Sequence, residues 1–124
     1  MSKILIVDDN AANVLLLEKM LKIAGYTHIK TLTDSREILK LYSIYEPDLI
    51  LLDFRMPFID GLQVIDSLNG LENSDNLPII MISAENEVEY YEKALSKGAI
   101  DFITKPFNYT DIIFKVENAL KVSY

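Results

Sequence analysis

Acidic residues stand directly after two unbroken apolar runs. Residues 49–52 are followed by Asp53, and residues 3–7 are followed by the pair Asp8 and Asp9. Short runs without polar alternation are typical of strands that are covered on both faces, as in parallel α/β sheets. Ligands of open α/β sheets bind outside the carboxyl ends of the strands. We therefore interpret the three aspartates as candidates for one site.

Two further runs end in groups that could hold an anion. Residues 78–82 lead to Ser83 and Ala84, and residues 100–104 lead to Lys105. Because parallel strands deliver their carboxyl ends to one edge of the sheet, a single crevice would hold three carboxylates, a hydroxyl and an ammonium group.

Such a cluster of carboxylates favours a bound cation. Carboxylates about 4 to 6 Å apart repel each other and raise the pKa of at least one of them unless a positive charge intervenes. Oxygen ligands with few protein carboxylates match Mg²⁺, which retains waters and takes further ligands from a phosphorylated substrate. Lys105 and Ser83 would then remain to bind anionic oxygens.

Each of these residues also has an ordinary structural alternative. Asp53 could cap a helix or a turn, although no helical pattern follows it directly. Asp8 or Asp9 could cap the first helix, but a cap requires one residue and does not explain two. Ser83 taken alone could be a turn hydroxyl, and Lys105 could be a surface lysine.

Five apolar runs alternate with five helical patterns. We predict strands over 3–7, 28–32, 49–53, 78–82 and 100–104, and helices over 14–24, 38–45, 62–68, 88–97 and 108–120. Asp34 with Glu37 resembles a capping box, and Asn86 with Glu89 resembles a second one. In the fourth helix the predicted buried face consists of Val88, Tyr91, Ala94 and Leu95. The alternation predicts a parallel sheet with right-handed crossovers and helices on both faces.

The composition fits one α/β domain over residues 1–124. Half of the residues are hydrophobic, and 124 residues suffice for a single core. The absence of cysteine excludes disulfides, thiolate chemistry and cysteine zinc sites, and the single histidine, His28, is interpreted as a surface residue. The net charge of −7 argues against direct nucleic-acid binding. Without an apolar run of membrane-spanning length or a signal segment, we expect a cytoplasmic protein with no membrane partner.

The site residues, taken together, resemble the receiver domain of bacterial two-component response regulators. The resemblance covers the whole chain and rests on five ordered elements: Asp8-Asp9, Asp53 with Met56-Pro57, Asp60-Gly61, Ser83-Ala84 and Lys105-Pro106-Phe107. It implies a single doubly wound (βα)5 domain, an α/β fold whose five-stranded parallel sheet has the order 2-1-3-4-5 and is flanked by five helices.

The resemblance also implies roles for the acidic residues. Asp53 would accept a phosphoryl group from a phospho-histidine or a small phosphodonor. Asp9 would bind Mg²⁺ directly and Asp8 through water, with Asp53 and the backbone carbonyl of Arg55 as further ligands. The domain would be mainly a regulatory phosphoacceptor that catalyses its own phosphorylation and dephosphorylation.

Other positions would bind the phosphoryl group and transmit its presence. Lys105, Ser83 and the amide of Ala84 would hold the phosphoryl oxygens, with Lys105 and Ser83 counted among the catalytic residues. Phe102 stands at the position of the family's aromatic switch, whose ring would turn inward as Ser83 moves. Phe102 has no hydroxyl, so only packing would report the change; a purely core role is the alternative.

Arg55 and Glu85 flank the site two residues after Asp53 and Ser83, respectively. An ion pair between them across the mouth of the site would slow hydrolysis of the phosphorylated form. We expect these two residues to modulate the rate of dephosphorylation.

The expected partners are a sensor histidine kinase or phosphotransfer protein and a downstream effector domain or protein. A phosphorylation-dependent dimer would use the fourth helix, the fifth strand and the fifth helix. We expect either a stand-alone regulator or, preferably, one domain of a longer protein. The alternatives are a Mg²⁺-dependent aspartyl-phosphate phosphatase or mutase and a pseudo-receiver that is not phosphorylated. A nucleotide or flavin binder would require a phosphate-cradling loop where Asp8 and Asp9 stand.

Overall fold

The computed structural model describes residues 2–71, 77–84 and 89–122. In chain order the elements are β1 (Lys3–Val7), α1 (Ala11–Ile23), β2 (His28–Leu32), the 3₁₀ helix η1 (Ser35–Glu37), α2 (Ile38–Tyr45), β3 (Leu49–Asp53), α3 (Gly61–Asn69), β4 (Ile79–Ala84), α4 (Tyr91–Ser96), β5 (Asp101–Lys105) and α5 (Tyr109–Val122). The strands form one parallel sheet in the order β2-β1-β3-β4-β5, which confirms the predicted fold and strand order.

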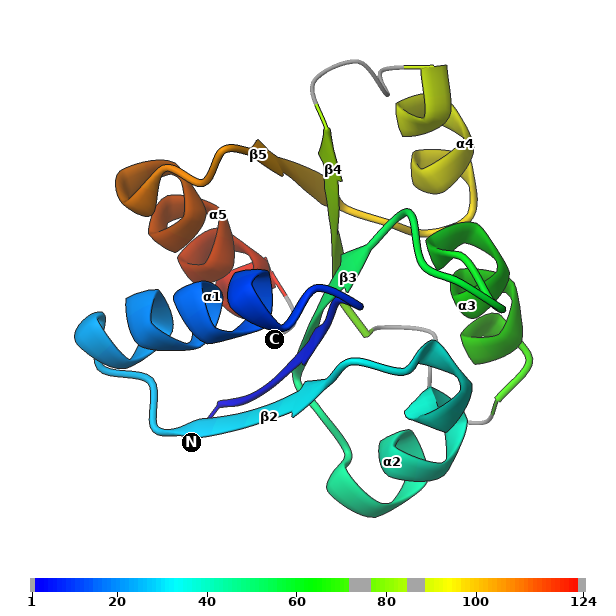
Figure 1. Ribbon diagram of the computed structural model, residues 1–124, viewed down its shortest axis with the longest axis horizontal. Helices are drawn as coiled ribbons and strands as arrows, with labels where there is room; N and C mark the ends of the chain where they lie inside the picture. The colour runs from blue at the N-terminus through cyan, green and yellow to red at the C-terminus, as the bar shows by residue number, and fades with distance from the viewer. Residues whose placement is uncertain (1, 72–76, 85–88, 123–124) are drawn as a thin grey trace.

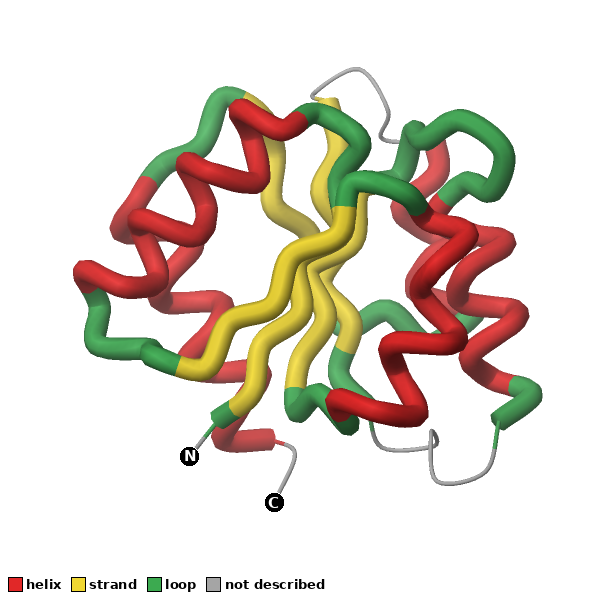
Figure 2. Tube along the Cα trace, turned by 60° about the horizontal axis from the view of Figure 1, so that its bottom comes forward, coloured by secondary structure: helices red, strands yellow, loops and turns green. Residues whose placement is uncertain are grey.

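The sheet is the middle of three layers. Helices α1 and α5 cover one face, and α2, α3 and α4 cover the other (Figure 1). Figure 2 shows the twisted sheet between the two groups of helices. Among the described helices, none is long and apolar enough to cross a membrane.

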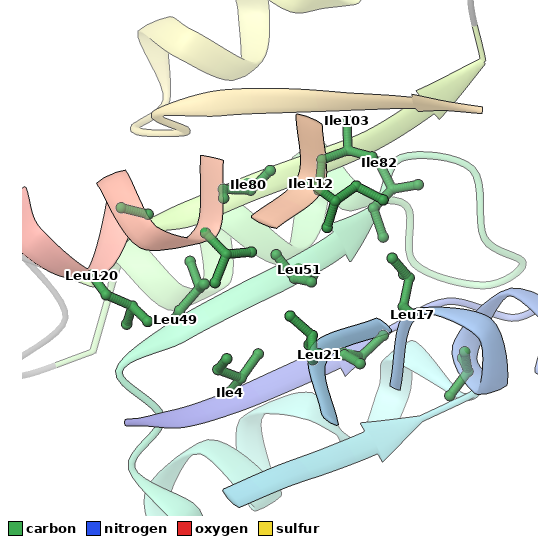
Figure 3. Packing of buried hydrophobic residues seen from close by; sticks show 14 residues of the cluster. Ile4, Leu17, Leu21, Leu49, Leu51, Ile80, Ile82, Ile103, Ile112 and Leu120 are labelled. Carbon is green, nitrogen blue, oxygen red and sulfur yellow. The ribbon is translucent and has the colours of Figure 1, made fainter. Parts of the chain in front are cut away.

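The unbroken apolar runs arise because each strand contributes to two cores. Successive side chains of a strand point to opposite faces. In β1, Ile4 and Ile6 pack under α1 and α5, whereas Leu5 and Val7 pack under the other three helices. Figure 3 shows the first of these cores, in which alternate residues of the central strands meet Leu17, Leu21, Ile112 and Leu120 of the two helices.

Polar side chains cap the starts of helices, and one predicted capping box does not form. The Asn10 side chain accepts hydrogen bonds at the start of α1, and Asp60 forms a capping box with Gln63 at the start of α3. The capping box predicted between Asp34 and Glu37 is wrong. Asp34 instead accepts from the backbone N–H of Arg36 and caps η1, because a 3₁₀ turn precedes α2 at this point.

The predicted buried face of α4 is only partly correct. Ala94 is buried, whereas Leu95 is 48% exposed, so its assignment to the buried face is wrong. Successive residues lie about 100° apart around a helix, and the close approach of α4 at Ala94 turns Leu95 toward solvent. Asn86 and Val88 lie outside the described residues, so the predicted cap at Asn86 stays a prediction.

Candidate functional site

The three aspartates selected from the sequence lie together at one edge of the sheet. One carboxylate oxygen from each of Asp8, Asp9 and Asp53 lies within 4.8 Å of the others. Asp8 and Asp53 are buried, with 0% and 3% of their surface exposed, whereas Asp9 is exposed. The cluster therefore has two desolvated carboxylates and one that faces the solvent.

Strand periodicity explains why a lysine joins the two buried acids. Asp53 continues the face of β3 that carries Leu49 and Leu51, and Lys105 continues the face of β5 that carries Ile103. All of these positions lie on the α1 and α5 side of the sheet. The Lys105 Nζ is 3.3 Å from Asp53 Oδ1 and 3.8 Å from Asp8 Oδ2. The ammonium group thus contacts both buried carboxylates.

The electrostatics of the cluster favour an additional positive charge. Burial of the carboxyl and, to a smaller extent, the nearby Asp8 carboxylate raise the pKa of Asp53 from 3.8 to about 7, although the Lys105 ammonium opposes the rise. One lysine therefore does not neutralise the site. A divalent cation among the three aspartates would favour their ionised forms.

The start of α1 supplies hydrogen bonds to Asp8. The backbone N–H of Asn10 donates to Asp8 Oδ1 at 2.9 Å, and the Asn13 side-chain amide donates to Oδ2 at 3.3 Å. Asn10 itself caps the helix, with Oδ1 accepting from the N–H groups of Ala12 and Asn13. The alternative that Asp8 serves as the helix cap is therefore wrong.

The loop that follows Asp53 packs back against the end of β3 at Gly61. The Gly61 N–H donates to the Phe54 carbonyl at 2.9 Å. A Cβ at position 61 would lie 2.6 Å from Met81 Cε and 2.8 Å from the Asp53 carbonyl oxygen, so a side chain here would push the loop off β3. The sequence indicated only a turn at Asp60 and Gly61. The requirement for close backbone approach is a feature of the tertiary structure.

Ser83 lies at the same edge but on the other face of the sheet. It is 3% exposed, and its position in β4 alternates with Ile82, which faces α1 and α5. The Ser83 hydroxyl is 3.4 Å from the Tyr91 hydroxyl, and the Tyr91 ring stacks on Phe102 with centroids 3.9 Å apart. Phe102 is half-buried. Tyr91 thus contacts both predicted switch residues, Ser83 and Phe102. The sequence pattern indicates only a packing role for Tyr91.

The remaining predicted site residues border this edge. Ala84 ends β4 and pairs with Lys105 of β5 in the parallel register. Arg55 is exposed and lines a cavity of about 480 Å³ beside Asp9, with its Cζ atom 5.9 Å from the centre of the Tyr90 ring. Glu85 lies outside the described residues, so its ion pair with Arg55 stays a prediction.

Comparison with known proteins identifies relatives over nearly the whole chain. The family model of the response regulator receiver domain matches residues 4–117. The alkaline phosphatase synthesis transcriptional regulatory protein PhoP of Bacillus subtilis is 37% identical over 121 residues, which are 98% of this chain and 49% of PhoP. The transcriptional regulatory protein PrrA of Mycobacterium bovis is 31% identical over 119 residues, or 96% of this chain and 50% of PrrA. The chain thus spans about half the length of these relatives.

Solved structures show the same architecture. A putative response regulator from Chloroflexus aurantiacus superimposes with a TM-score of 0.91 at 28% identity, covering 97% of this chain and 98% of that one. The receiver domain of NtrX from Brucella abortus gives 0.89 at 31% identity and covers 96% and 98% of the two chains. Together with the family match, these similarities establish that the chain belongs to the response regulator receiver domain family.

Proposed function

We propose that this domain is a phosphorylation-dependent switch that accepts a phosphoryl group on Asp53. The observation that carries the proposal is the contact between a buried carboxylate and an ammonium group, Asp53 and Lys105, at 3.3 Å. Positioning and charge neutralisation are most of what phosphoryl transfer requires from a protein. The donor would be a phospho-histidine of a sensor kinase or phosphotransfer protein.

The carboxylate cluster fits Mg²⁺ as the cofactor. Asp8, Asp9 and Asp53 offer only oxygen ligands, all within 4.8 Å of one another, and a hard divalent cation prefers such ligands. The backbone carbonyl of Arg55 would complete the protein ligands. When bound, the cation would offset the charge of the carboxylates and of the incoming phosphoryl group.

The proposed transfer exchanges one bond to phosphorus for another. An ionised Asp53 oxygen attacks the phosphorus, a P–O bond forms, and the P–N bond to the donor imidazole breaks with its electron pair left on the imidazole nitrogen. Lys105 would bind the transferred phosphoryl oxygens by charge and Ser83 by its hydroxyl, with the Ala84 amide as a further donor. Asp53 must be ionised for this attack, so the contacts that lower its pKa also favour the reaction.

A direct test is incubation with acetyl phosphate, followed by mass measurement of the intact protein. With Mg²⁺ the domain is expected to gain one phosphoryl group per chain, and with EDTA it is expected to gain none within the same time. Equal incorporation with and without the cation would contradict the role of the carboxylate cluster. Absence of incorporation under every condition would favour a pseudo-receiver.

The output surface is proposed to be α4, β5 and α5. The stacking of Tyr91 on Phe102 and the Ser83–Tyr91 hydroxyl contact support a packing path from the phosphorylation site to α4. Exposed Leu95 and Phe114 lie on α4 and α5 of this surface, which would serve an effector or a phosphorylation-dependent dimer. The relatives' greater length supports an effector segment elsewhere in the whole protein.

This proposal predicts where binding of a phosphoryl mimic changes the domain. A phosphorylated aspartate adds roughly −1.5 to −2 charge beside Lys105. With beryllofluoride and Mg²⁺, amide exchange is expected to slow most within residues 91–97 and 102–107. Changes confined to α1 and α2, measured by exchange or by NMR shifts, would contradict this output surface.

A further inference from the structure

The loop between β3 and α3 contains a strained turn at Phe58. Its φ of +71° lies in the left-handed region, and the Ile59 N–H donates to the Pro57 carbonyl at 2.8 Å across it. A hydrogen bond between residues i and i+2 around a positive φ defines a classic γ-turn, which is rare and strained. The Phe58 side chain is 71% exposed, so burial of its ring does not compensate for the strain.

A buried serine in η1 contacts the two carbonyls that flank this turn. Ser35, in η1, is 2% exposed, and its hydroxyl donates to the Ile59 carbonyl at 2.8 Å while lying 3.5 Å from the Pro57 carbonyl. Within residues 2–71, 77–84 and 89–122, the other buried polar or charged side chains are Asp8, Asp53 and Ser83. Ser35 is thus the one member of this set that the proposed reaction does not use.

The neighbouring arginine holds the side chain of the same turn. The Arg36 Cζ lies 3.8 Å from the centre of the Phe58 ring. Asp34 fixes this guanidinium with a 2.8 Å ion pair, and its carboxylate also accepts from the Arg36 N–H. Residues 34–36, which follow β2, therefore contact both the backbone of the strained turn and the ring of Phe58.

We propose that Ser35 is a positioning residue for the metal-binding part of the site. The Gly61–Phe54 hydrogen bond joins the two ends of residues 54–61, and Ser35 holds the Ile59 carbonyl within this segment. Arg55, whose carbonyl is the proposed ligand, lies in the stretch between Phe54 and Ile59. The inference rests on the proposed function, because it assigns Ser35 to keep the Arg55 carbonyl in place for the cation.

Ser35→Ala removes the anchor while leaving every proposed ligand in place. A buried neutral hydrogen bond of this kind corresponds to about a two- to tenfold change in an equilibrium constant. The Kd for Mg²⁺, measured by calorimetry on the unphosphorylated protein, is expected to rise by that factor. The Mg²⁺ concentration for half-maximal phosphorylation should rise equally, with the rate at saturating Mg²⁺ near that of the wild type.

The matched control is Ser43→Ala. Ser43 is an exposed serine in α2 whose hydroxyl also donates to a backbone carbonyl, that of Lys40, at 3.0 Å. This variant is expected to bind Mg²⁺ like the wild type. Ser35→Thr, which keeps the hydroxyl, is expected to bind Mg²⁺ more tightly than Ser35→Ala.

Phe58→Gly tests the mechanism independently. Glycine adopts positive φ without strain, so the turn should no longer need the serine. In the Phe58→Gly background, Ser35→Ala is therefore expected to change the Kd by less than twofold. In EDTA, exchange of the Ile59 amide should accelerate in Ser35→Ala and not in Ser43→Ala.

Two outcomes would overturn the inference. Ser35→Ala could leave the Kd for Mg²⁺ unchanged, whatever the exchange rate of the Ile59 amide, or it could raise the Kd by the same factor with Phe58 and with glycine at position 58. Phosphorylation of the wild type at Asp53 would still support the proposed function in either case. Conversely, a higher Kd for Mg²⁺ in Ser35→Ala would support the positioning role of Ser35 even if Asp53 never accepted a phosphoryl group.

Discussion

In EDTA at pH 8, Asp53→Asn is expected to be more stable than the wild-type domain, by at most about 4 kcal/mol. The reason is that burial and the Asp8 carboxylate raise the pKa of Asp53 from 3.8 to about 7 in the folded protein. Between these two values the folded state binds more protons than the unfolded state. The contribution of Asp53 to the free energy of unfolding therefore falls as the pH rises from about 4 to about 7 and is constant above that range. Asparagine does not ionise and avoids this loss.

The measurement is urea unfolding of both proteins from pH 4 to pH 8 in EDTA. The advantage of Asp53→Asn should be largest above pH 7 and should disappear near pH 4. The pKa of about 7 already includes the opposing effect of the Lys105 contact, so the upper limit of the gain allows for the loss of that contact. Asp66→Asn, which alters an exposed aspartate paired with Lys97, is the control and should change stability by about 0.5 kcal/mol or less.

Asp8→Asn should show the same trend with a smaller gain. Removal of the Asp8 charge lowers the pKa of Asp53, but it also weakens the hydrogen bonds that Asp8 accepts from Asn10 and Asn13. Mg²⁺ should stabilise the wild type by an amount set by the ratio of its concentration to its Kd, and so reduce the advantage of both variants. Lower stability of both variants at pH 8 in EDTA would show that other groups satisfy these carboxylates.

The second large effect is expected for Asp9→Ala. Asp9 is the exposed member of the cluster and the proposed direct ligand, so its removal should weaken Mg²⁺ binding without disturbing the buried core. Loss of an outer-shell partner of a metal ligand already costs about 10- to 100-fold, so loss of a direct ligand should raise the Kd by about a hundredfold. The rate of phosphorylation at low Mg²⁺ concentration should fall by a similar factor.

Calorimetry and phosphorylation as a function of Mg²⁺ concentration measure this effect. Asp66→Ala, at an exposed position on α3, is the control and should behave as the wild type. Stability of Asp9→Ala in EDTA should equal or exceed that of the wild type, because one negative charge has left the cluster. A Kd within a few fold of the wild-type value would show that the cation binds elsewhere.

Local sequence signals were sufficient for the sheet and for the acidic cluster. The apolar runs before Asp8 and Asp53 are continuous because alternate residues enter two cores, and parallel pairing then brings the strand ends to one edge. Asn10 caps α1 and Asp60 caps α3 through residues only two or three positions away, so these contacts are local in the sequence. The same parallel topology brings Lys105, at the end of β5, to the edge of the sheet where Asp53 lies.

Contacts between segments distant in sequence were beyond such reasoning. The Ser83–Tyr91 and Tyr91–Phe102 contacts depend on how α4 sits on the sheet, and the exposure of Leu95 depends on the same packing. Ser35 reads as an ordinary loop serine because its acceptor, Ile59, is 24 residues away. Positive φ at a phenylalanine likewise carries no signal in the sequence.

The most direct test of the phosphoacceptor assignment is chemical mapping of the modified residue. After incubation with acetyl phosphate and Mg²⁺, borohydride reduction converts an aspartyl acyl phosphate to homoserine, which peptide mass spectrometry locates. We expect homoserine at position 53 alone in the wild type and no phosphoryl uptake by Asp53→Asn, with Asp66→Asn modified as the wild type. Homoserine at position 8 or 9, or uptake by Asp53→Asn to the wild-type extent, would contradict the assignment of Asp53 as the phosphoacceptor.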